Sequence, residues 1–270
     1  MWNFDKIIIE IVALLVCEGS MHKTYEVERD GYKISGELYL PEDQKGRYPV
    51  IIMSHGFGAS REGCRPYAEI MVEAGFACYI FDFCGGGLSS KSDGKMTEMS
   101  VLTESADIEA IVKDIRKAPF ADRKNIFLMG ESQGGVASTI AAGDTPGDVR
   151  AMILLYPAYI LFDDAKRKYP DKSMIEDTTT VFGLPVGRKF YEDAFSLNID
   201  DYMVRYSGNV LIIHGNIDEI VPISYSIAAK KKFPAAKVVQ IDEAGHGFYG
   251  KEVVEAGRKM VSFIENNLSD

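Results

Sequence analysis

Short apolar runs alternate with amphipathic helical patterns along most of the chain, and this alternation constrains the fold more than any other feature. Runs such as residues 48–56 and 124–130 are almost continuously apolar, which is typical of strands buried on both faces. In residues 103–117, by contrast, apolar side chains such as Ile108 and Ile111 recur at helical spacing. Strands that alternate with helices predict a mostly parallel sheet flanked by helices, the α/β class.

The pattern gives the expected elements in order. The predicted strands are residues 48–56, 76–83, 124–130, 149–157, 208–215 and 236–243, and the predicted helices are residues 67–75, 103–117, 133–143, 223–233 and 251–268. Ahead of them, residues 24–40 are predicted to form two strands around the turn pair Asp30-Gly31.

The charge balance narrows the class of partner. The 270 residues include 40 acidic and 30 basic side chains, which gives a formal net charge of −10. Nucleic-acid binding depends on positive potential over phosphates, so it is not expected. No run approaches the roughly 20 apolar residues of a membrane-spanning helix, so stable membrane insertion is not expected either. We therefore expect the partner to be a small molecule. The charge balance does not decide whether the chain forms a homodimer.

Residues 1–20 form an N-terminal extension whose role the sequence leaves open. The apolar run 7–17 resembles the core of a secretory signal, but Glu10 interrupts it and Lys6 beside Asp5 gives no net positive head. An extra helix, an upstream-start extension or a cloning remnant are the alternatives.

The four cysteines contain no C-x-x-C pair, which is typical of a reducing compartment. We therefore expect a cytoplasmic protein, with secretion as the alternative.

One long segment interrupts the alternation. Residues 159–206 separate two predicted strands that a connection of a few residues would normally join. We expect this segment to fold as short helices and to act as a lid over a core formed by residues 21–158 and 207–270, because long insertions in compact domains are commonly binding elements. The alternative is a surface excursion without function.

The stretch GESQGG, residues 130–135, carries the strongest chemical signal. Residues 130–134 satisfy G-x-S-x-G, and they stand between a predicted strand and a predicted helix. That context is what a nucleophile elbow requires, since a sharp turn presents the serine hydroxyl above the sheet edge. Ser132 is the candidate nucleophile. The alternative is a small residue that allows close packing of strand and helix.

A serine hydroxyl needs a base to remove its proton, and the chain has four histidines. His22 precedes the first hairpin, while His55 and His214 each close an apolar strand and are expected to be structural. His246 lies in a glycine-flanked loop after the last predicted strand, where a loop can carry a base. His246 is therefore the candidate base, and an ordinary surface histidine is the alternative.

The base in turn needs an acid that orients it. Asp218 follows the penultimate strand, so Ser132, Asp218 and His246 stand in the chain order of this type of triad. Glu219 and Asp242 are the alternatives for the acid, and a turn aspartate that caps a helix is the structural alternative for Asp218.

An oxyanion needs donors that are already in place. The backbone N–H of Gln133, directly after the nucleophile, is one candidate, and that of Phe57, in the loop HGFGAS after a predicted strand, is the other. Other chemistries fit less well: the glycine-rich residues 83–89 lack the lysine of a phosphate-binding loop, and the histidines and cysteines show no metal-ligand spacing. No metal or organic cofactor is expected.

With these residues in place, the chain resembles the α/β-hydrolase superfamily, and within it the bacterial cinnamoyl or feruloyl esterases and the serine-aminopeptidase-like hydrolases. The supporting stretches are HGFGASRE, FDFCGGGLSSKSDGKMTEMSVLTE, GESQGG, LIIHGNIDEIVP and GHGFYG. The resemblance implies an α/β-hydrolase fold with an inserted helical lid, a triad of Ser132, Asp218 and His246, and oxyanion donors at Phe57 and Gln133. It also implies a serine carboxylesterase that acts on small acyl or aromatic esters, such as hydroxycinnamoyl esters.

Two departures from the resemblance matter. Related esterases more often have histidine before the nucleophile, where this chain has Glu131. The resemblance also implies lid tyrosine and aspartate groups that hold a phenolic hydroxyl; Asp164 and Tyr191 are the candidates, with Phe190 as the alternative for the tyrosine. An aminopeptidase or a monoacylglycerol lipase on the same fold is the alternative function, and an acyltransferase or a binding protein without catalysis fits less well.

Overall fold

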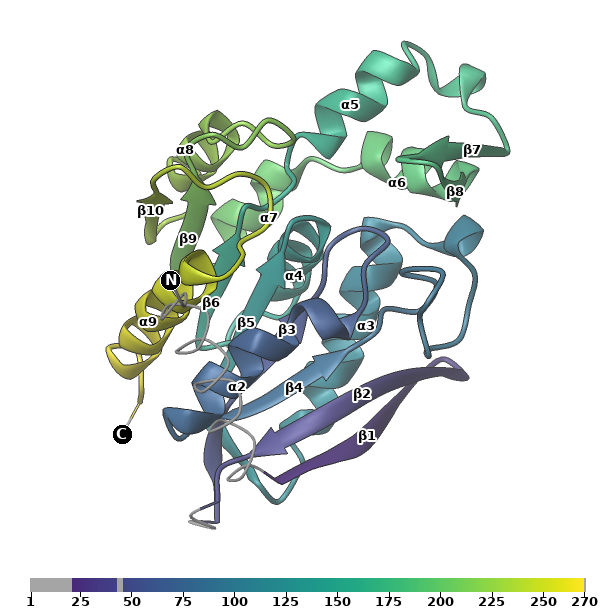
Figure 1. The fold of residues 1–270 in the computed structure, drawn as a ribbon. Helices are drawn as coiled ribbons and strands as arrows, with labels where there is room; N and C mark the ends of the chain where they lie inside the picture. The colour runs from purple at the N-terminus through teal and green to yellow at the C-terminus, as the bar shows by residue number, and fades with distance from the viewer. Residues whose placement is uncertain (1–20, 43–45, 270) are drawn as a thin grey trace, which may run out of the picture.

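The computed structural model describes residues 21–42 and 46–269, and it consists of a twisted sheet with helices on both faces and an insertion above one end (Figure 1). The main sheet has eight strands in the order β1-β2-β4-β3-β5-β6-β9-β10. The pairs β1–β2 and β2–β4 are antiparallel, and the other five pairs are parallel. The mostly parallel sheet predicted from the sequence is confirmed.

The bounds of the elements follow the predicted runs closely. The strands are β1 Met21–Arg29, β2 Tyr32–Leu40, β3 Tyr48–Ser54, β4 Ala77–Phe81, β5 Ala121–Glu131, β6 Ala151–Leu155, β7 Thr178–Val181, β8 Leu184–Gly187, β9 Asn209–Gly215 and β10 Ala236–Ile241. The α-helices are α2 Arg65–Glu73, α3 Val101–Ile115, α4 Gln133–Asp144, α5 Leu161–Lys168, α6 Arg188–Ser196, α7 Ile199–Arg205, α8 Ser224–Lys230 and α9 Lys251–Glu265. Short 3₁₀ turns lie at η1 Arg61–Gly63, η2 Met96–Glu98 and η3 Lys172–Met174.

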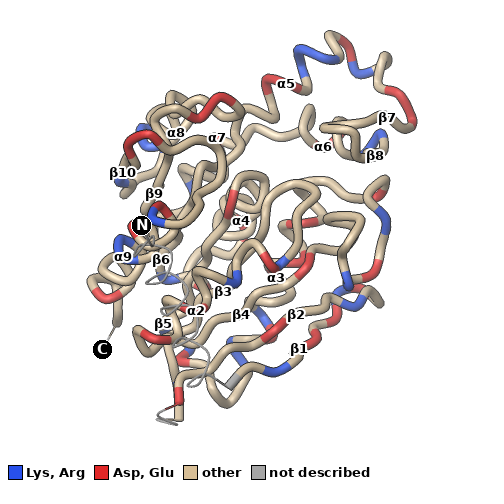
Figure 2. The backbone as a smooth tube through the Cα atoms, viewed as in Figure 1, with Lys and Arg blue, Asp and Glu red and all other residues tan. Residues whose placement is uncertain are grey.

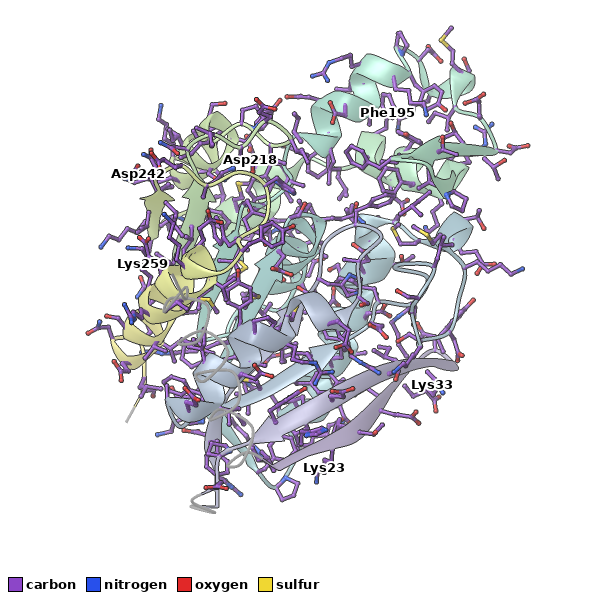
Figure 3. All side chains as sticks on the ribbon, in the orientation of Figure 1. Lys23, Lys33, Phe195, Asp218, Asp242 and Lys259 are labelled. Atoms are coloured by element: carbon purple, nitrogen blue, oxygen red, sulfur yellow. The ribbon has the colours of Figure 1, made fainter. Side chains whose placement is uncertain are left out.

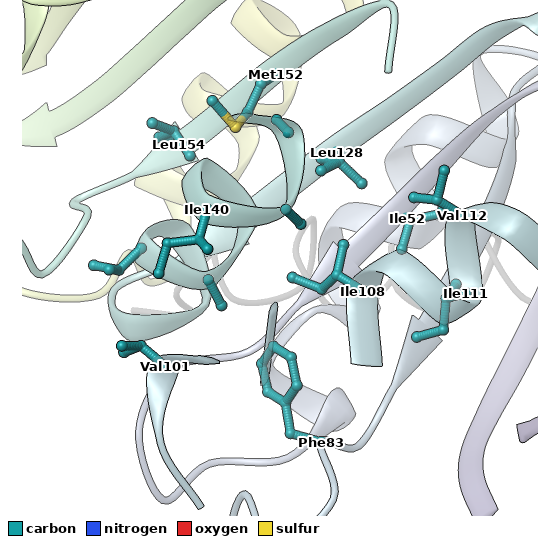
Figure 4. Packing of buried hydrophobic residues seen from close by; sticks show 14 of the residues in the cluster. Ile52, Phe83, Val101, Ile108, Ile111, Val112, Leu128, Ile140, Met152 and Leu154 are labelled. Atoms are coloured by element: carbon teal, nitrogen blue, oxygen red, sulfur yellow. The ribbon is translucent and has the colours of Figure 1, made fainter. Parts of the chain in front are cut away.

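The sheet separates two hydrophobic cores, because successive side chains of a strand point to opposite faces. In β3, Ile52 belongs to the core under α3 and α4, whereas Ile51 belongs to the core under α2 and α9. Figure 4 shows part of the first core, to which Ile108 of α3, Ile140 of α4 and Leu128 of β5 all contribute. The apolar stripe predicted for residues 103–117 faces this core.

The N-terminal hairpin forms at the predicted turn. Asp30 and Gly31 connect β1 to β2 with φ angles of 52° and 83°, and both are left-handed. Two left-handed residues in a two-residue loop match the twist of a hairpin, and Asp-Gly is a favoured pair there. The hairpin extends the sheet beyond β4, at the edge opposite β9 and β10 (Figure 1).

The insertion between β6 and β9 is not wholly helical, which corrects the predicted helical lid. It contains α5, η3, the hairpin β7–β8, α6 and α7. The hairpin turns at Phe182 and Gly183, with φ angles of 49° and 78°. Threonine and valine favour the extended backbone of β7, and the glycine permits the tight turn. The domain bounds 159–206 remain a prediction.

The two ends of the insertion have different surroundings. Helix α7 packs on α4 so closely that a Cβ at Gly143 would lie 2.8 Å from the carbonyl oxygen of Tyr202. Arg205 of α7 also pairs with Asp144 of α4 at 3.0 Å. Helix α5 and the hairpin β7–β8 instead project beyond the carboxyl ends of the parallel strands (Figure 1). The insertion is therefore anchored to the core at α7, and also where Gly187 of β8 packs on Thr97 of η2 and Asp193 of α6 accepts from Ser100, while α5 overhangs the sheet.

The surface of the described residues carries charges of both signs. Acidic and basic residues are interspersed along the insertion and the outer helices (Figure 2). Within residues 21–42 and 46–269, no helix is long and apolar enough to cross a membrane. Cys64, Cys78 and Cys84 are buried free thiols. The expectations for residues 1–20, including the signal alternative, and for Cys17 lie outside the described residues.

Candidate active site

Ser132 occupies the sharp turn between β5 and α4. Its φ of 49° and ψ of −116° are rarely adopted by residues with a side chain. The backbone holds this conformation from both sides: the Ser132 N–H donates to the Leu155 carbonyl at 2.9 Å, and its carbonyl accepts from the Ala158 N–H at 3.0 Å. The chain thus fixes the hydroxyl at the carboxyl end of the central strand.

The glycines of the motif are required by the closeness of neighbouring backbone. A Cβ at Gly134 would lie 2.4 Å from the His55 carbonyl oxygen, and one at Gly130 would lie 2.5 Å from the Gly134 carbonyl oxygen. No side chain fits at either position without moving main chain. These contacts are the structural reason for the glycine pattern around Ser132.

Ser132, His246 and Asp218 form one chain of hydrogen bonds. The Nε2 of His246 lies 2.9 Å from Ser132 Oγ, and the Nδ1 of His246 lies 2.8 Å from Asp218 Oδ2. A carboxylate can only accept, so Nδ1 carries the proton and Nε2 is free to accept from the serine hydroxyl. This is the geometry in which an imidazole can remove the serine proton.

Asp218 is buried and strongly held. Its Oδ1 accepts the backbone N–H groups of Ile220 at 2.9 Å and Val221 at 2.8 Å. Burial alone would raise the pKa of the Asp218 carboxyl, but hydrogen bonds from His214, His246 and Val221 outweigh it and hold the pKa well below its usual range. The group opposite His246 is therefore a carboxylate at any ordinary pH.

The structure separates Asp218 from the two alternative acids. Asp242 lies farther out beside β10, as Figure 3 shows, and its Oδ1 accepts from the Gln240 side chain at 2.6 Å. Glu219 is exposed. Of the three candidates only Asp218 reaches His246, and it does so from the loop after β9.

His55 and His214 are buried, as their positions at strand ends predict. His55 Nδ1 lies 2.8 Å from the Gly56 carbonyl, and its Nε2 accepts the Phe83 N–H at 3.1 Å. Burial lowers the pKa of His55. His214 is different: its Nε2 lies 3.2 Å from Asp218 Oδ2, so it supports the acid from behind, a contact that the sequence analysis missed.

A cavity of about 850 Å³ lies between the strand ends and the insertion. Ser132 and His246 line it together with Phe57 and Gln133, whereas Asp218 does not line it because it sits behind the imidazole. Phe190 packs edge-on against Phe57 with ring centroids 5.8 Å apart, which makes this part of the wall apolar. A volume of this size suits a small organic ligand.

Phe57 and Gln133, the predicted oxyanion donors, both line the cavity with Ser132. Gln133 begins α4, so its N–H lies at the positive end of a helix dipole. The Gln133 side chain points away into the core, where its Nε2 donates to both carboxyl oxygens of Glu104 at 3.0 Å. The loop with Phe57 is held by a hydrogen bond from the Gly58 N–H to the Gly86 carbonyl at 3.1 Å. The donor role itself remains a prediction.

Asp164 and Tyr191 both line the cavity, from α5 and α6. Asp164 is paired with Arg167, and Lys168 Nζ lies 5.2 Å from the Tyr191 ring centroid. Phe190 lines the same cavity, so both alternatives for the lid aromatic reach it. These side chains are available to a ligand, and their role remains a prediction. Within residues 21–42 and 46–269 no His, Cys, Asp and Glu group could hold a metal ion.

Comparisons with known proteins agree with this architecture. Est1E from Butyrivibrio proteoclasticus, solved with ferulic acid bound, is similar with a TM-score of 0.83 and 26% identity, over 90% of this chain and 98% of that chain. The chain belongs to the α/β-hydrolase superfamily. Within that superfamily, residues 47–174 match the family model described as serine aminopeptidase, S33.

The alignments with curated relatives extend over a smaller share of each relative than the alignment with Est1E does. The alpha/beta hydrolase domain-containing protein 17C of Xenopus tropicalis is 30% identical over 214 residues, 78% of this chain and 60% of the relative. An uncharacterized 31.7 kDa protein of Escherichia coli is 34% identical over 90 residues, 33% of this chain and 30% of the relative. The chain therefore spans less than two thirds of the length of either relative.

Proposed function

We propose that the protein is a serine carboxylesterase that acts on small acyl or aromatic esters. The observation that carries the proposal is the hydrogen-bonded chain from Ser132 through His246 to Asp218 at the wall of a cavity of about 850 Å³.

The acylation step begins at Ser132. Its Oγ attacks the ester carbonyl while His246 Nε2 takes the hydroxyl proton, and the negative charge of the tetrahedral intermediate faces the N–H groups of Gln133 and Phe57. Asp218 keeps His246 oriented and stabilises the imidazolium. The intermediate then expels the alcohol, which receives the proton from His246 and leaves an acyl-enzyme.

Deacylation repeats the sequence with water. His246 takes a proton from the water as its oxygen attacks the acyl carbonyl, and it returns that proton to Ser132 Oγ as the carboxylic acid leaves. No cofactor enters this cycle.

A hydroxycinnamoyl ester is the substrate that we propose within this class. The similar structure Est1E is solved with ferulic acid, and here the aromatic side chains Phe57 and Phe190 pack on each other and line the same cavity as Ser132. Asp164 and Tyr191 supply polar groups from the insertion for a phenolic hydroxyl. An aminopeptidase is the second candidate, supported by the family model that matches residues 47–174.

The test is a comparison of kcat/KM for methyl ferulate, p-nitrophenyl butyrate, an alanine anilide and a monoacylglycerol. Ser132→Ala should reduce ester hydrolysis by at least about 10³-fold, because the acyl-enzyme can no longer form. Ser262→Ala, an exposed serine of α9, is the matched control and should leave the rates unchanged. Hydrolysis that persists in Ser132→Ala refutes the proposed triad. A higher kcat/KM for the alanine anilide than for the esters refutes the assignment as an esterase.

A further inference from the structure

Glu131, the last residue of β5, is a buried carboxyl group directly before Ser132. Only 9% of its surface is exposed, yet it lies in the wall of the cavity. In the described part of the chain it forms no ion pair with lysine or arginine. A buried carboxylate without a cation is costly, so such a position calls for an explanation.

The two carboxyl oxygens of Glu131 have separate partners. Oε1 accepts the hydroxyl of Tyr156 at 2.7 Å, and the thiol of Cys64 lies 3.7 Å from Oε2. Tyr156 is itself fixed: its φ is 38°, and its N–H donates to the Ile213 carbonyl at 2.8 Å. The hydrogen bond from Tyr156 therefore connects the carboxyl group to a ring that has little freedom to move.

That ring packs against the base of the proposed triad. The centroids of Tyr156 and His246 are 4.9 Å apart with an interplanar angle of 62°, and Phe248 packs edge-on against the other side of Tyr156 at 4.9 Å. Glu131, Tyr156 and His246 thus follow one another in direct contact. Removing the Tyr156 hydrogen bond would release the surface on which the imidazole rests.

The charges of this cluster are coupled. Burial raises the pKa of the Glu131 carboxyl, while hydrogen bonds from Tyr156 and Cys64 and a positive charge at His246 lower it. The titratable groups that face Glu131 also include Tyr67 of α2, and Asp218 faces His246 from the other side.

We propose that Glu131 is a positioning residue, which anchors Tyr156 against His246 and stabilises the imidazolium that forms when His246 takes the proton of Ser132. This inference rests on the proposed function for its catalytic consequence, but the coupling between Glu131 and His246 can be measured without turnover. It assigns a role to the residue that replaces the histidine more common before the nucleophile in the esterases that the sequence resembles.

The contacts argue against the other use of this carboxyl group, as an anchor for the amino group of a peptide. Oε1 is already occupied by the Tyr156 hydroxyl, and Oε2 faces Cys64 and the backbone, since a Cβ at Gly63 would lie 3.3 Å from it. A substrate amine would have to displace these neighbours. The imidazolium of His246 needs no such displacement.

The experiment measures the protonation of His246 by NMR and the pH profile of kcat/KM in the same variants. Glu131→Gln keeps the side-chain size and an acceptor for Tyr156 but removes the charge. The His246 midpoint and the acidic limb should both move to lower pH by at least about 0.5 unit. Tyr156→Phe should move them in the same direction by less, and the double variant should move them no further than Glu131→Gln alone. His246→Gln assigns the resonance.

The matched control is Glu109→Gln, which removes a half-buried carboxyl group of α3 that accepts a hydrogen bond from Ser105 at 3.2 Å. It should leave both midpoints in place. A Glu131→Gln variant with reduced stability or kcat but unchanged midpoints overturns the proposal, because a structural role alone would behave in that way. A rise in KM confined to the alanine anilide also overturns it. If Ser132→Ala retains full ester hydrolysis, the proposed function fails, while the NMR midpoint still decides the coupling.

Discussion

Replacing Ser132 with glycine should stabilise the fold while it removes the proposed nucleophile. A side chain held at φ 49° and ψ −116° costs roughly 1–3 kcal/mol, a strain that glycine does not have. Glycine in turn loses roughly 0.4–1 kcal/mol through the greater freedom of the unfolded chain. The balance favours glycine by about 1 kcal/mol, because Ser132 faces the cavity and little packing is lost.

Ser132→Ala is the control, because alanine keeps Cβ and its strain but loses the same hydroxyl. Chemical denaturation should therefore find Ser132→Gly more stable than Ser132→Ala by about 1 kcal/mol, with a melting temperature about 2–4 °C higher. Neither variant should hydrolyse esters, so activity does not enter the comparison. If the glycine variant is equally or less stable than the alanine variant, the turn is not strained and the reasoning fails.

Gly134, Glu104 and Phe182 allow three further tests, of close packing, of a buried carboxyl group and of an exposed aromatic ring. Gly134→Ala places Cβ 2.4 Å from the His55 carbonyl oxygen and should lower the free energy of unfolding by about 3 kcal/mol; an unchanged denaturation midpoint would contradict the packing argument. Burial raises the pKa of Glu104 to about 8, so the folded state binds this proton more tightly. The protonated Glu104 therefore contributes its full share to the free energy of unfolding below about pH 4.5, and this share falls as the pH rises to 8. Glu104→Gln should flatten this dependence of the free energy of unfolding on pH, measured by denaturation at several pH values. Phe182→Ser, at an 80% exposed residue of the cavity rim, should raise KM for aromatic esters about threefold without changing the melting temperature; an equal rise for short aliphatic esters would exclude a ring contact.

The elements on either side of Ser132 were the easiest to predict, because their residue types strongly favour one local structure. A continuous apolar run before Gly130 and small residues after Ser132 admit few structures other than a buried strand, a sharp turn and a helix. The same holds for the Asp30-Gly31 hairpin. In both places the residue types already indicate the backbone conformation, and at Ser132 the contacts with Leu155, Ala158 and His55 then hold it.

Choices that depend on distant contacts were not decided by sequence. Asp218, Glu219 and Asp242 are chemically alike, and only the packing of the loops after β9 and β10 places the first of them beside His246. The contact of His214 with Asp218 had no signal beyond its position at a strand end.

The hairpin β7–β8 had a weak signal that the sequence analysis did not use. The run of threonines before Phe182-Gly183 is typical of a strand that ends in a tight turn. Aromatic and charged residues around it favoured helices, and η3 and α6 do flank the hairpin. The hairpin forms a separate two-stranded sheet, and Val186 is the fully buried apolar side chain of its strands, so they lack the continuous apolar runs that mark the main strands.

The packing of α7 on α4 limits which parts of the chain can be exchanged between relatives. Helix α4 begins directly after Ser132, so a graft that shifts α7 should disturb the turn at Ser132 through the contact between Tyr202 and Gly143. The stretch from η3 to β8 has no such connection to α4. Transplanting that stretch alone from a related hydrolase is therefore the economical way to retune selectivity in this scaffold, with α5 and α7 left in place and the close packing of Gly187 on the Thr97 carbonyl retained.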